Sequence, residues 1–231
     1  TRADAGIGRV VNGLRKSGQF DNTIIMVFSD NGASSEDVKA RRLHIPGAKI
    51  GARGSYVSYE KQGAFTSNTP LRDYKGSTHE GAVRSPLIIS WPKGLASTQY
   101  DTHSEMVTIL DVMPTILTAA GVDISSVSLS GRDLKSALTG GEKPAAKPFF
   151  WDHVGWRGIR DGKWKAVSSP GSKSWTLYNL EEDPVEAVDL AAKYPERITA
   201  MQSDWQLWAD RVGVKPMSMQ ALMKIFFPKA Q

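Results

Sequence analysis

The feature that most constrains this fold is a short apolar run that ends in a carboxylate, an amide and a glycine. Residues 24–28 (IIMVF) are apolar without polar alternation, and Ser29, Asp30, Asn31 and Gly32 follow directly. A strand has this pattern when both of its faces are covered, as in a parallel α/β sheet. In open α/β sheets the chemically active side chains lie at the carboxyl ends of such strands. We therefore expect an α/β domain with functional side chains at Asp30 and Asn31.

Length and composition are compatible with one sizeable core and a small additional unit. The chain has 231 residues, of which 40% are apolar, and it contains no cysteine. The lack of cysteine excludes disulfides, thiolate metal sites and a cysteine nucleophile from this sequence. No apolar run approaches the ~18 residues that a membrane span needs. The formal charge of +5 favours an anionic partner only weakly, and we expect no nucleic-acid partner.

Helical and strand patterns surround the first strand. Residues 4–17 have apolar side chains at helical spacing and precede Gly18, which predicts an amphipathic helix. Residues 86–91 (PLIISW) predict a second buried strand, and residues 106–120 predict another helix, in which Asp111 is expected to be a cap. The helix–turn–strand order is half of a βαβ unit, so we expect the chain to begin within its domain. Residues 33–70 lack a sustained period and predict a long loop that either lines a site or is a solvated insertion.

The pattern changes after the turn-rich segment 140–148 (GGEKPAAKP). Short aromatic strands are predicted at residues 148–154, 156–160, 163–167 and 175–180, with a hairpin at Asp161-Gly162. Pro195 opens a helix whose apolar stripe, which includes Trp205 and Trp208, is expected to pack against this meander. We therefore predict three parts: an α/β domain over residues 1–140, a small antiparallel α+β subdomain over residues 148–214, and a tail over residues 215–231.

Candidate chemistry lies at two places. Asp30 and Asn31 offer the hard oxygen ligands that Ca²⁺ and Mg²⁺ prefer, although Asp-Asn-Gly is also a common turn sequence. Calcium takes about six to eight oxygens, so two side chains alone cannot complete a site. Lys75, which precedes Gly76, could bind the oxygens of a sulfate or phosphate group, or it could be a solvated surface charge.

A second interpretation exists for the charged residues that follow Lys75. Glu80 and Arg84 are four positions apart, so they could form an ion pair on one helical turn without any role in chemistry.

Several blocks of the sequence, in the same serial order, resemble the sulfatase family of the alkaline-phosphatase-like superfamily. They are DNTIIMVFSDNG, SNTPLRDYKGSTHEGAVRSPLIISWPKG, LDVMPTILTAAGV, SGRDL, WDHVGWRGIRDGKWKAV and LYNLEEDPVEAVDLA, followed by the last predicted helix. The resemblance covers the chain except its C-terminal tail. It implies the C-terminal part of an alkaline-phosphatase-like α/β/α sheet domain, plus a small subdomain with a four-stranded antiparallel sheet and a packed helix.

The resemblance also implies a function, which is sulfuric ester hydrolysis of the arylsulfatase type. Asp30 and Asn31 match divalent-metal ligands of the family, usually for Ca²⁺, with Mg²⁺ possible. Lys75 matches the lysine that contacts the substrate sulfate. His153 falls where relatives carry a histidine near the substrate pocket, or it is a structural hydrogen-bonding residue. The implied substrate is a small sulfate ester or a sulfated glycan, and the implied location is the periplasm or the exterior of a bacterium.

The chain departs from the family pattern at the nucleophile. The family makes formylglycine from a Cys/Ser-x-Pro-x-Arg motif, but residues 90–94 (SWPKG) lack the arginine and residues 68–72 (NTPLR) begin with asparagine. We therefore expect this chain to be the C-terminal half of a sulfatase and to be inactive alone. Ala82, Ser85 and Trp156 also depart from the pattern, which puts the substrate pocket in question.

Two alternatives to a sulfatase remain open. One is a phosphodiesterase or phosphonate hydrolase of the same superfamily, although Asn31 favours sulfate because those relatives more often carry histidine there. The other is a non-catalytic fragment that binds calcium or sulfated glycans, or a gene remnant.

Overall fold

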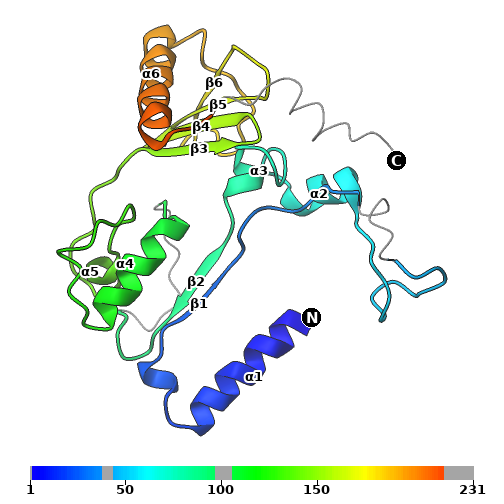
Figure 1. Ribbon diagram of the computed structural model, residues 1–231, viewed down its shortest axis with the longest axis vertical. Coiled ribbons are helices and arrows are strands. Elements are labelled where there is room, and N and C mark those ends of the chain that lie inside the picture. The colour runs from blue at the N-terminus through cyan, green and yellow to red at the C-terminus, as the bar shows by residue number, and fades with distance from the viewer. Residues whose placement is uncertain (1, 38–43, 97–105, 216–231) are drawn as a thin grey trace. The chain divides into compact units, whose positions relative to one another are not determined.

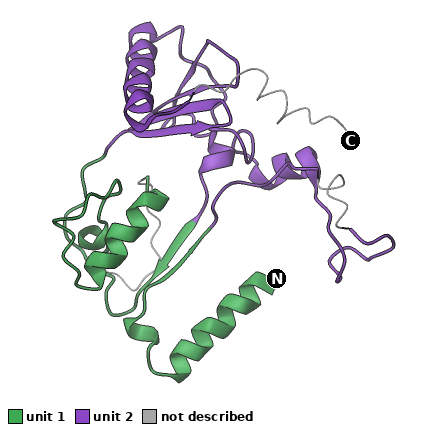
Figure 2. Ribbon diagram, in the orientation of Figure 1, with its two compact units in different colours: residues 1–28, 87–146 green, residues 29–86, 147–231 purple. Residues whose placement is uncertain are grey.

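The computed structural model describes residues 2–37, 44–96 and 106–215 (Figure 1). The chain forms two compact units, and each unit combines two separate stretches of sequence (Figure 2). The first unit contains residues 1–28 and 87–146, and the second contains residues 29–86 and 147–231. Asp30, Asn31, Lys75 and His153, the predicted site residues, all belong to the second unit.

The first unit is built on a pair of short strands. Its elements are α1 (Arg2–Lys16), η1 (Phe20–Asn22), β1 (Ile25–Phe28), β2 (Leu87–Ser90), α4 (Ile109–Ala119) and α5 (Lys135–Leu138). Strands β1 and β2 pair in antiparallel register from Ile25↔Ser90 to Phe28↔Leu87, so the prediction of parallel pairing is wrong here. Full burial of both strands is also wrong, because Phe28 is 44% and Ile88 is 63% exposed. Among the described residues β1 and β2 pair only with each other, so each has one edge without a strand partner.

The helices of the first unit follow the sequence pattern more closely. Helix α1 confirms the predicted amphipathic helix and is followed by Gly18 in a left-handed conformation (φ +71°). Helix α4 starts at Ile109, two positions before Asp111, whose carboxylate Oδ2 accepts the backbone N–H of Thr108 at 3.0 Å. The same oxygen lies 2.7 Å from Arg132 Nη2. Thr108 is the N-cap residue, and Asp111, the third residue of the helix, completes a capping box with it. Asp111 thus contributes to the cap as predicted, although the helix begins earlier than an N-cap at Asp111 would require.

The second unit is organised around a four-stranded antiparallel meander. Its elements are α2 (Glu60–Asn68), α3 (Glu80–Val83), β3 (Phe149–His153), β4 (Trp156–Asp161), β5 (Trp164–Ser168), β6 (Thr176–Asn179) and α6 (Pro195–Val212). The sheet order is β3-β4-β5-β6, which confirms the predicted meander and its hairpin at Asp161-Gly162. Helix α2 lies inside the stretch that was predicted to be a loop. That prediction is wrong over residues 60–68, because Gly63 and the polar residues around it leave little apolar period to detect.

Helix α6 covers one face of the meander and closes its core (Figure 1). The core residues are Ile159, Ala166, Trp175 and Leu177 from the sheet and its loops, and Ile198, Met201, Trp205 and Ala209 from α6. Trp205 is 5% exposed, and its Nε1 donates a hydrogen bond to the carbonyl of Trp151 at 2.8 Å. Trp205 is a core residue and the partly buried Trp208 packs against the same core, so the predicted core contacts of these tryptophans are confirmed. Residues 216–231 of the predicted tail lie outside the described residues.

Among the described residues, no helix combines the length and apolar character that a membrane crossing requires.

Candidate active site

The segment that follows β1 packs directly on the segment around α3. Ser29 Oγ donates to the carbonyl of Asn31 at 2.9 Å, and the Gly32 N–H donates to the carbonyl of Ala82 at 2.8 Å. A Cβ atom at Gly32 would overlap the carbonyl oxygen of Gly81. The glycine after Asp30-Asn31 is therefore required for this close backbone approach, not only for a turn.

Asp30 and Asn31 have different surroundings. Asp30 is exposed, whereas Asn31 is half-buried and donates its Nδ2 to the carbonyl of Gly32 at 2.7 Å. Because the nitrogen is used in this bond, the carbonyl oxygen Oδ1 is the atom of Asn31 that a cation could bind. Asn31 also lines an open depression of about 500 Å³, together with Asn68 and Arg84.

Asn68 connects the three backbone segments of this region. Its Oδ1 accepts the N–H of Ala33 at 3.1 Å, and its Nδ2 donates to the carbonyls of Asp73 at 2.9 Å and Gly81 at 2.8 Å. In the sequence analysis Asn68 was noted only because it occupies the position where the nucleophile motif has Cys or Ser. Its role in connecting these segments was not predicted. No local pattern indicates it, since the Ala33 partner is 35 positions away.

Lys75 lies beside the chain that leaves Asn31. Its backbone N–H donates to the carbonyl of Ala33 at 2.9 Å, two positions after Asn31. Its ammonium lies 3.2 Å from Glu36 Oε1, and the two side chains are 42% and 43% exposed. Gly76, which follows, has φ +106°, a conformation that other residues rarely adopt. Lys75 thus presents a partly exposed cation from a loop bonded to the segment after β1.

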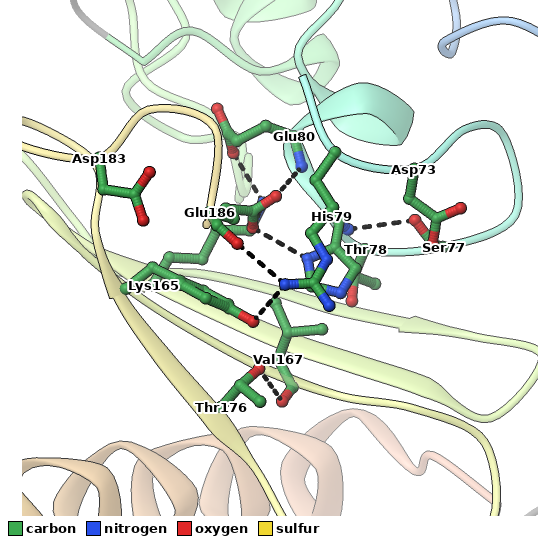
Figure 3. A network of polar contacts seen from close by, with 12 residues as sticks. Asp73, Ser77, Thr78, His79, Glu80, Lys165, Val167, Thr176, Asp183 and Glu186 are labelled. Carbon is green, nitrogen blue, oxygen red and sulfur yellow. Dashed lines mark hydrogen bonds and ion pairs between the residues drawn. The ribbon is translucent and has the colours of Figure 1, made fainter. Parts of the chain in front are cut away.

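A buried network of charged side chains joins the chain around α3 to the meander (Figure 3). Lys165 of β5 is fully buried, and its Nζ lies 2.7 Å from Glu80 Oε1 and 3.1 Å from Glu186 Oε1. His79 Nδ1 lies 3.2 Å from Glu186 Oε1. The Glu80 N–H donates to Glu186 Oε2 at 2.7 Å. These contacts join the chain around α3 to the meander.

The charge state of Glu186 follows from this network. Burial acts to raise the pKa of Glu186, but the hydrogen bond from His79 and the charge of Lys165 outweigh it, so the pKa lies below its usual value. The carboxylate of Glu80 contacts Lys165 and also lies 3.9 Å from Arg160 Nη1. Among the described contacts it does not pair with Arg84, so that interpretation is wrong. Sequence reasoning missed Lys165 and Glu186, because a single charged residue in a strand or loop is most often solvated.

The β3–β4 hairpin carries His153 and Trp156 opposite each other. His153 is exposed at the end of β3. Trp156, one of the departures noted above, packs edge-on against the ring of His79, with centroids 5.7 Å apart. The hairpin therefore contacts the Lys75-bearing segment through Trp156 and the buried His79, which sequence reasoning did not select.

Two family models match most of the chain. The model described as Sulfatase matches residues 1–122, and the model described as N-sulphoglucosamine sulphohydrolase, C-terminal, matches residues 74–208. This chain belongs to the sulfatase family. An uncharacterized sulfatase of Schizosaccharomyces pombe is 31% identical over 91% of this chain and 42% of its own length. Human arylsulfatase A is 27% identical over 99% of this chain and 42% of its own length.

The solved structures agree with this assignment. The crystal structure of Ps i-CgsB in complex with k-i-k-neocarrahexaose aligns with a TM-score of 0.67 and 25% identity, over 98% of this chain and 46% of that one. A second structure, described as the crystal structure of Ps i-CgsB, aligns with a TM-score of 0.66 and 28% identity, over 89% of this chain and 40% of that one. The sulfatase chain thus spans less than half the length of the relatives it matches.

The metal ligands that a sulfatase implies can be compared with the donors present. Asp30 offers a carboxylate and Asn31 an amide oxygen, both hard donors that suit Ca²⁺ or Mg²⁺. Within the described ranges no group of three or more His, Cys, Asp or Glu residues could hold a metal ion. Asp30 and Asn31 therefore fit as part of a ligand set and not as a complete one.

Proposed function

We propose that the sulfatase containing this chain hydrolyses sulfate esters, and that this chain supplies one side of the pocket. Lys75 contacts the sulfate group, and Asp30 and Asn31 are two ligands of a divalent metal, Ca²⁺ first and Mg²⁺ second. The observation that carries the proposal is the hydrogen bond from the Lys75 N–H to the carbonyl of Ala33 at 2.9 Å. This bond holds an ammonium-bearing loop beside the chain that leaves Asp30 and Asn31.

The chemistry of each group suits a sulfate monoester. The negative charge of the transferring group is shared among its oxygens, and a fixed ammonium such as that of Lys75 stabilises this charge in the transition state. Asp30 and Asn31 would hold a divalent metal through their hard oxygens. Such a metal would supply Lewis-acid polarisation of the sulfate group. We further propose that the remaining ligands and the formylglycine nucleophile come from parts of the protein outside this chain, so that the chain alone is inactive.

Among substrates we favour a sulfated glycan over a small aryl sulfate. The support is the similarity to Ps i-CgsB, whose crystal structure is described in complex with k-i-k-neocarrahexaose. His153, exposed on the β3–β4 hairpin, is our candidate for a further contact to such a substrate. Export to the periplasm or the exterior of a bacterium is part of the same proposal.

The decisive experiment replaces Lys75 with alanine in the full-length protein and measures kcat/KM on an aryl sulfate. Removing one group that stabilises transition-state charge is expected to lower kcat by about 100-fold or more. Lys163→Ala is the matched control, because Lys163 is 41% exposed and pairs with Glu181 at 3.9 Å, much as Lys75 pairs with Glu36. Both variants should retain the wild-type unfolding transition. Wild-type kinetics in Lys75→Ala would remove Lys75 from the site.

A paired assay separates sulfate from phosphate chemistry. The full-length protein is given matched aryl sulfate and aryl phosphate esters, and faster cleavage of the phosphate would overturn the assignment to sulfate. Elemental analysis of Asp30→Ala tests the metal assignment, since the variant should retain less divalent metal than wild type. Full metal retention would exclude Asp30 as a ligand.

A further inference from the structure

One residue, Glu186, holds both ends of the segment that carries Lys75. Glu186 is 0% exposed and has a left-handed backbone conformation (φ +58°), which is uncommon for a residue with a side chain. It lies in the loop after β6, far from the segment 72–80 in sequence. Figure 3 shows it between the chain around α3 and the strands of the meander.

The N-terminal end of segment 72–80 is held through the backbone of Glu186. Arg72 Nη1 donates to the carbonyl oxygen of Glu186 at 2.9 Å and to the hydroxyl of Tyr178 at 3.0 Å. The guanidinium also lies 5.8 Å from the centroid of the Tyr178 ring. The backbone carbonyl of Glu186 and the hydroxyl of Tyr178 therefore hold the start of the segment. The carboxylate of Glu186 is left for other contacts.

The C-terminal end of the segment is held through the carboxylate of Glu186. Oε2 accepts the Glu80 N–H at 2.7 Å, and Oε1 lies 3.2 Å from His79 Nδ1. Lys165 Nζ, 3.1 Å from Oε1, keeps this carboxylate charged within the core and binds Glu80 at the same time. Both carboxylate oxygens and the backbone oxygen of Glu186 are thus used to fix one loop.

Lys75 lies between these two fixed ends. Its own backbone N–H donates to the carbonyl of Ala33. A shift of either end of the segment would move the Lys75 ammonium relative to Asp30 and Asn31. Displacements of about 1 Å at a reacting group can reduce turnover by about 100-fold.

We propose that Glu186 is a positioning residue for Lys75, acting through segment 72–80; this inference rests on the proposed role of Lys75 in binding sulfate. Glu186 does not touch substrate in this proposal. It sets the location of the Lys75 ammonium, and it requires a carboxylate because the Lys165 ammonium, the His79 imidazole and the Glu80 N–H all meet its two oxygens.

The test is a double-variant cycle in the full-length protein, with kcat and KM measured on an aryl sulfate. Glu186→Gln keeps the shape of the side chain but places a neutral amide against Lys165 and His79. We expect kcat/KM to fall by about 10-fold or more, mainly through kcat, because the misplaced ammonium is lost from the transition state. In the double variant with Lys75→Ala, activity should be no lower than in Lys75→Ala alone. Glu181→Gln, 72% exposed in the same loop, is the control and should leave kinetics unchanged.

The outcomes separate the two proposals. Additive losses in the double variant would show that Glu186 affects activity independently of Lys75, and they would overturn this inference while leaving the role of Lys75 intact. Wild-type activity in Lys75→Ala would instead refute the proposed function. If Glu186→Gln has no cooperative unfolding transition, Arg72→Lys replaces it in the cycle, since it removes the fixation at the other end of the segment. The losses of kcat/KM in Arg72→Lys and Lys75→Ala must then be non-additive in the double variant. Additive losses would overturn the inference.

Discussion

Replacing Lys165 with methionine tests the buried network most directly. The Lys165 ammonium is fully buried within 2.7 Å of Glu80 Oε1 and 3.1 Å of Glu186 Oε1. Methionine has a similar length but no charge, so the variant leaves two carboxylates in the core without their shared cation. Breaking a buried ion pair by removing one partner costs about 3–5 kcal/mol of unfolding free energy. We expect a loss in this range near pH 7.

The assay is urea unfolding followed by tryptophan fluorescence, because Trp175 and Trp205 lie in the core beside the meander. Lys163→Met is the matched control, since Lys163 is 41% exposed and pairs with Glu181 at 3.9 Å. An exposed pair of this kind contributes about 0–1 kcal/mol, so the control should be close to wild type.

The unfolding free energy of wild type and Lys165→Met should also depend differently on pH. The pKa of Glu186 in the folded protein lies below its ordinary value, because the contacts with His79 and Lys165 outweigh burial. Its contribution to stability is therefore present above the unfolded pKa and is lost as the pH falls through the folded pKa. In Lys165→Met the Glu186 carboxylate loses its cation and protonates more easily, so the difference in unfolding free energy between variant and wild type should shrink in acid. A loss below about 1 kcal/mol at pH 7, or a difference that stays constant into acid, would refute the reasoning.

Three further substitutions give distinct results. Gly32→Ala should lower the unfolding free energy by about 3 kcal/mol and reduce the thermal unfolding midpoint accordingly, because the new Cβ overlaps the carbonyl of Gly81. An unchanged midpoint would contradict this close approach. Glu36 and the substrate sulfate would compete for the Lys75 ammonium, so Glu36→Gln should lower KM for an aryl sulfate. The decrease should be at most about fivefold, since an exposed ion pair is worth at most ~1 kcal/mol. A raised KM would contradict this competition. Asp111→Asn should cost about 3 kcal/mol in urea unfolding near pH 7. The pKa of Asp111 is lowered, since hydrogen bonds to its carboxylate outweigh burial, so the wild type but not the variant should lose this stability as the pH falls through that pKa.

Local patterns in the sequence were enough to predict a large part of the second unit. The alternating aromatic strands, the hairpin at Asp161-Gly162 and the helix that opens at Pro195 all depend on spacings of two or about 3.6 residues and on turn residues. The cap at Asp111 is equally local, because its partner Thr108 is three positions away. Such features depend on neighbouring residues, which the sequence displays directly.

The pairing of β1 with β2 could not be predicted in the same way. An apolar run such as residues 24–28 shows that a strand is present, but the direction of its partner and the covering of its faces depend on distant parts of the chain. Contacts between distant parts of the chain decide the antiparallel register and the exposure of Phe28 and Ile88. The parallel assignment was wrong because an apolar run indicates only that the faces of a strand are covered, and it does not fix the direction of the neighbouring strand.

The sequence by itself determined the family and the identity of its candidate site residues, Asp30, Asn31, Lys75 and His153, because the family motifs are continuous stretches of chain. Only the tertiary structure decided what holds Lys75 in place. Glu80 and Lys165 are 85 positions apart, and Glu80 and Glu186 are 106 apart. In sequence each is an ordinary charged residue that would be solvated, and only folding places the three together where water is excluded. The physical reason is that burial and charge pairing are properties of residues that meet in space, whatever their separation along the chain.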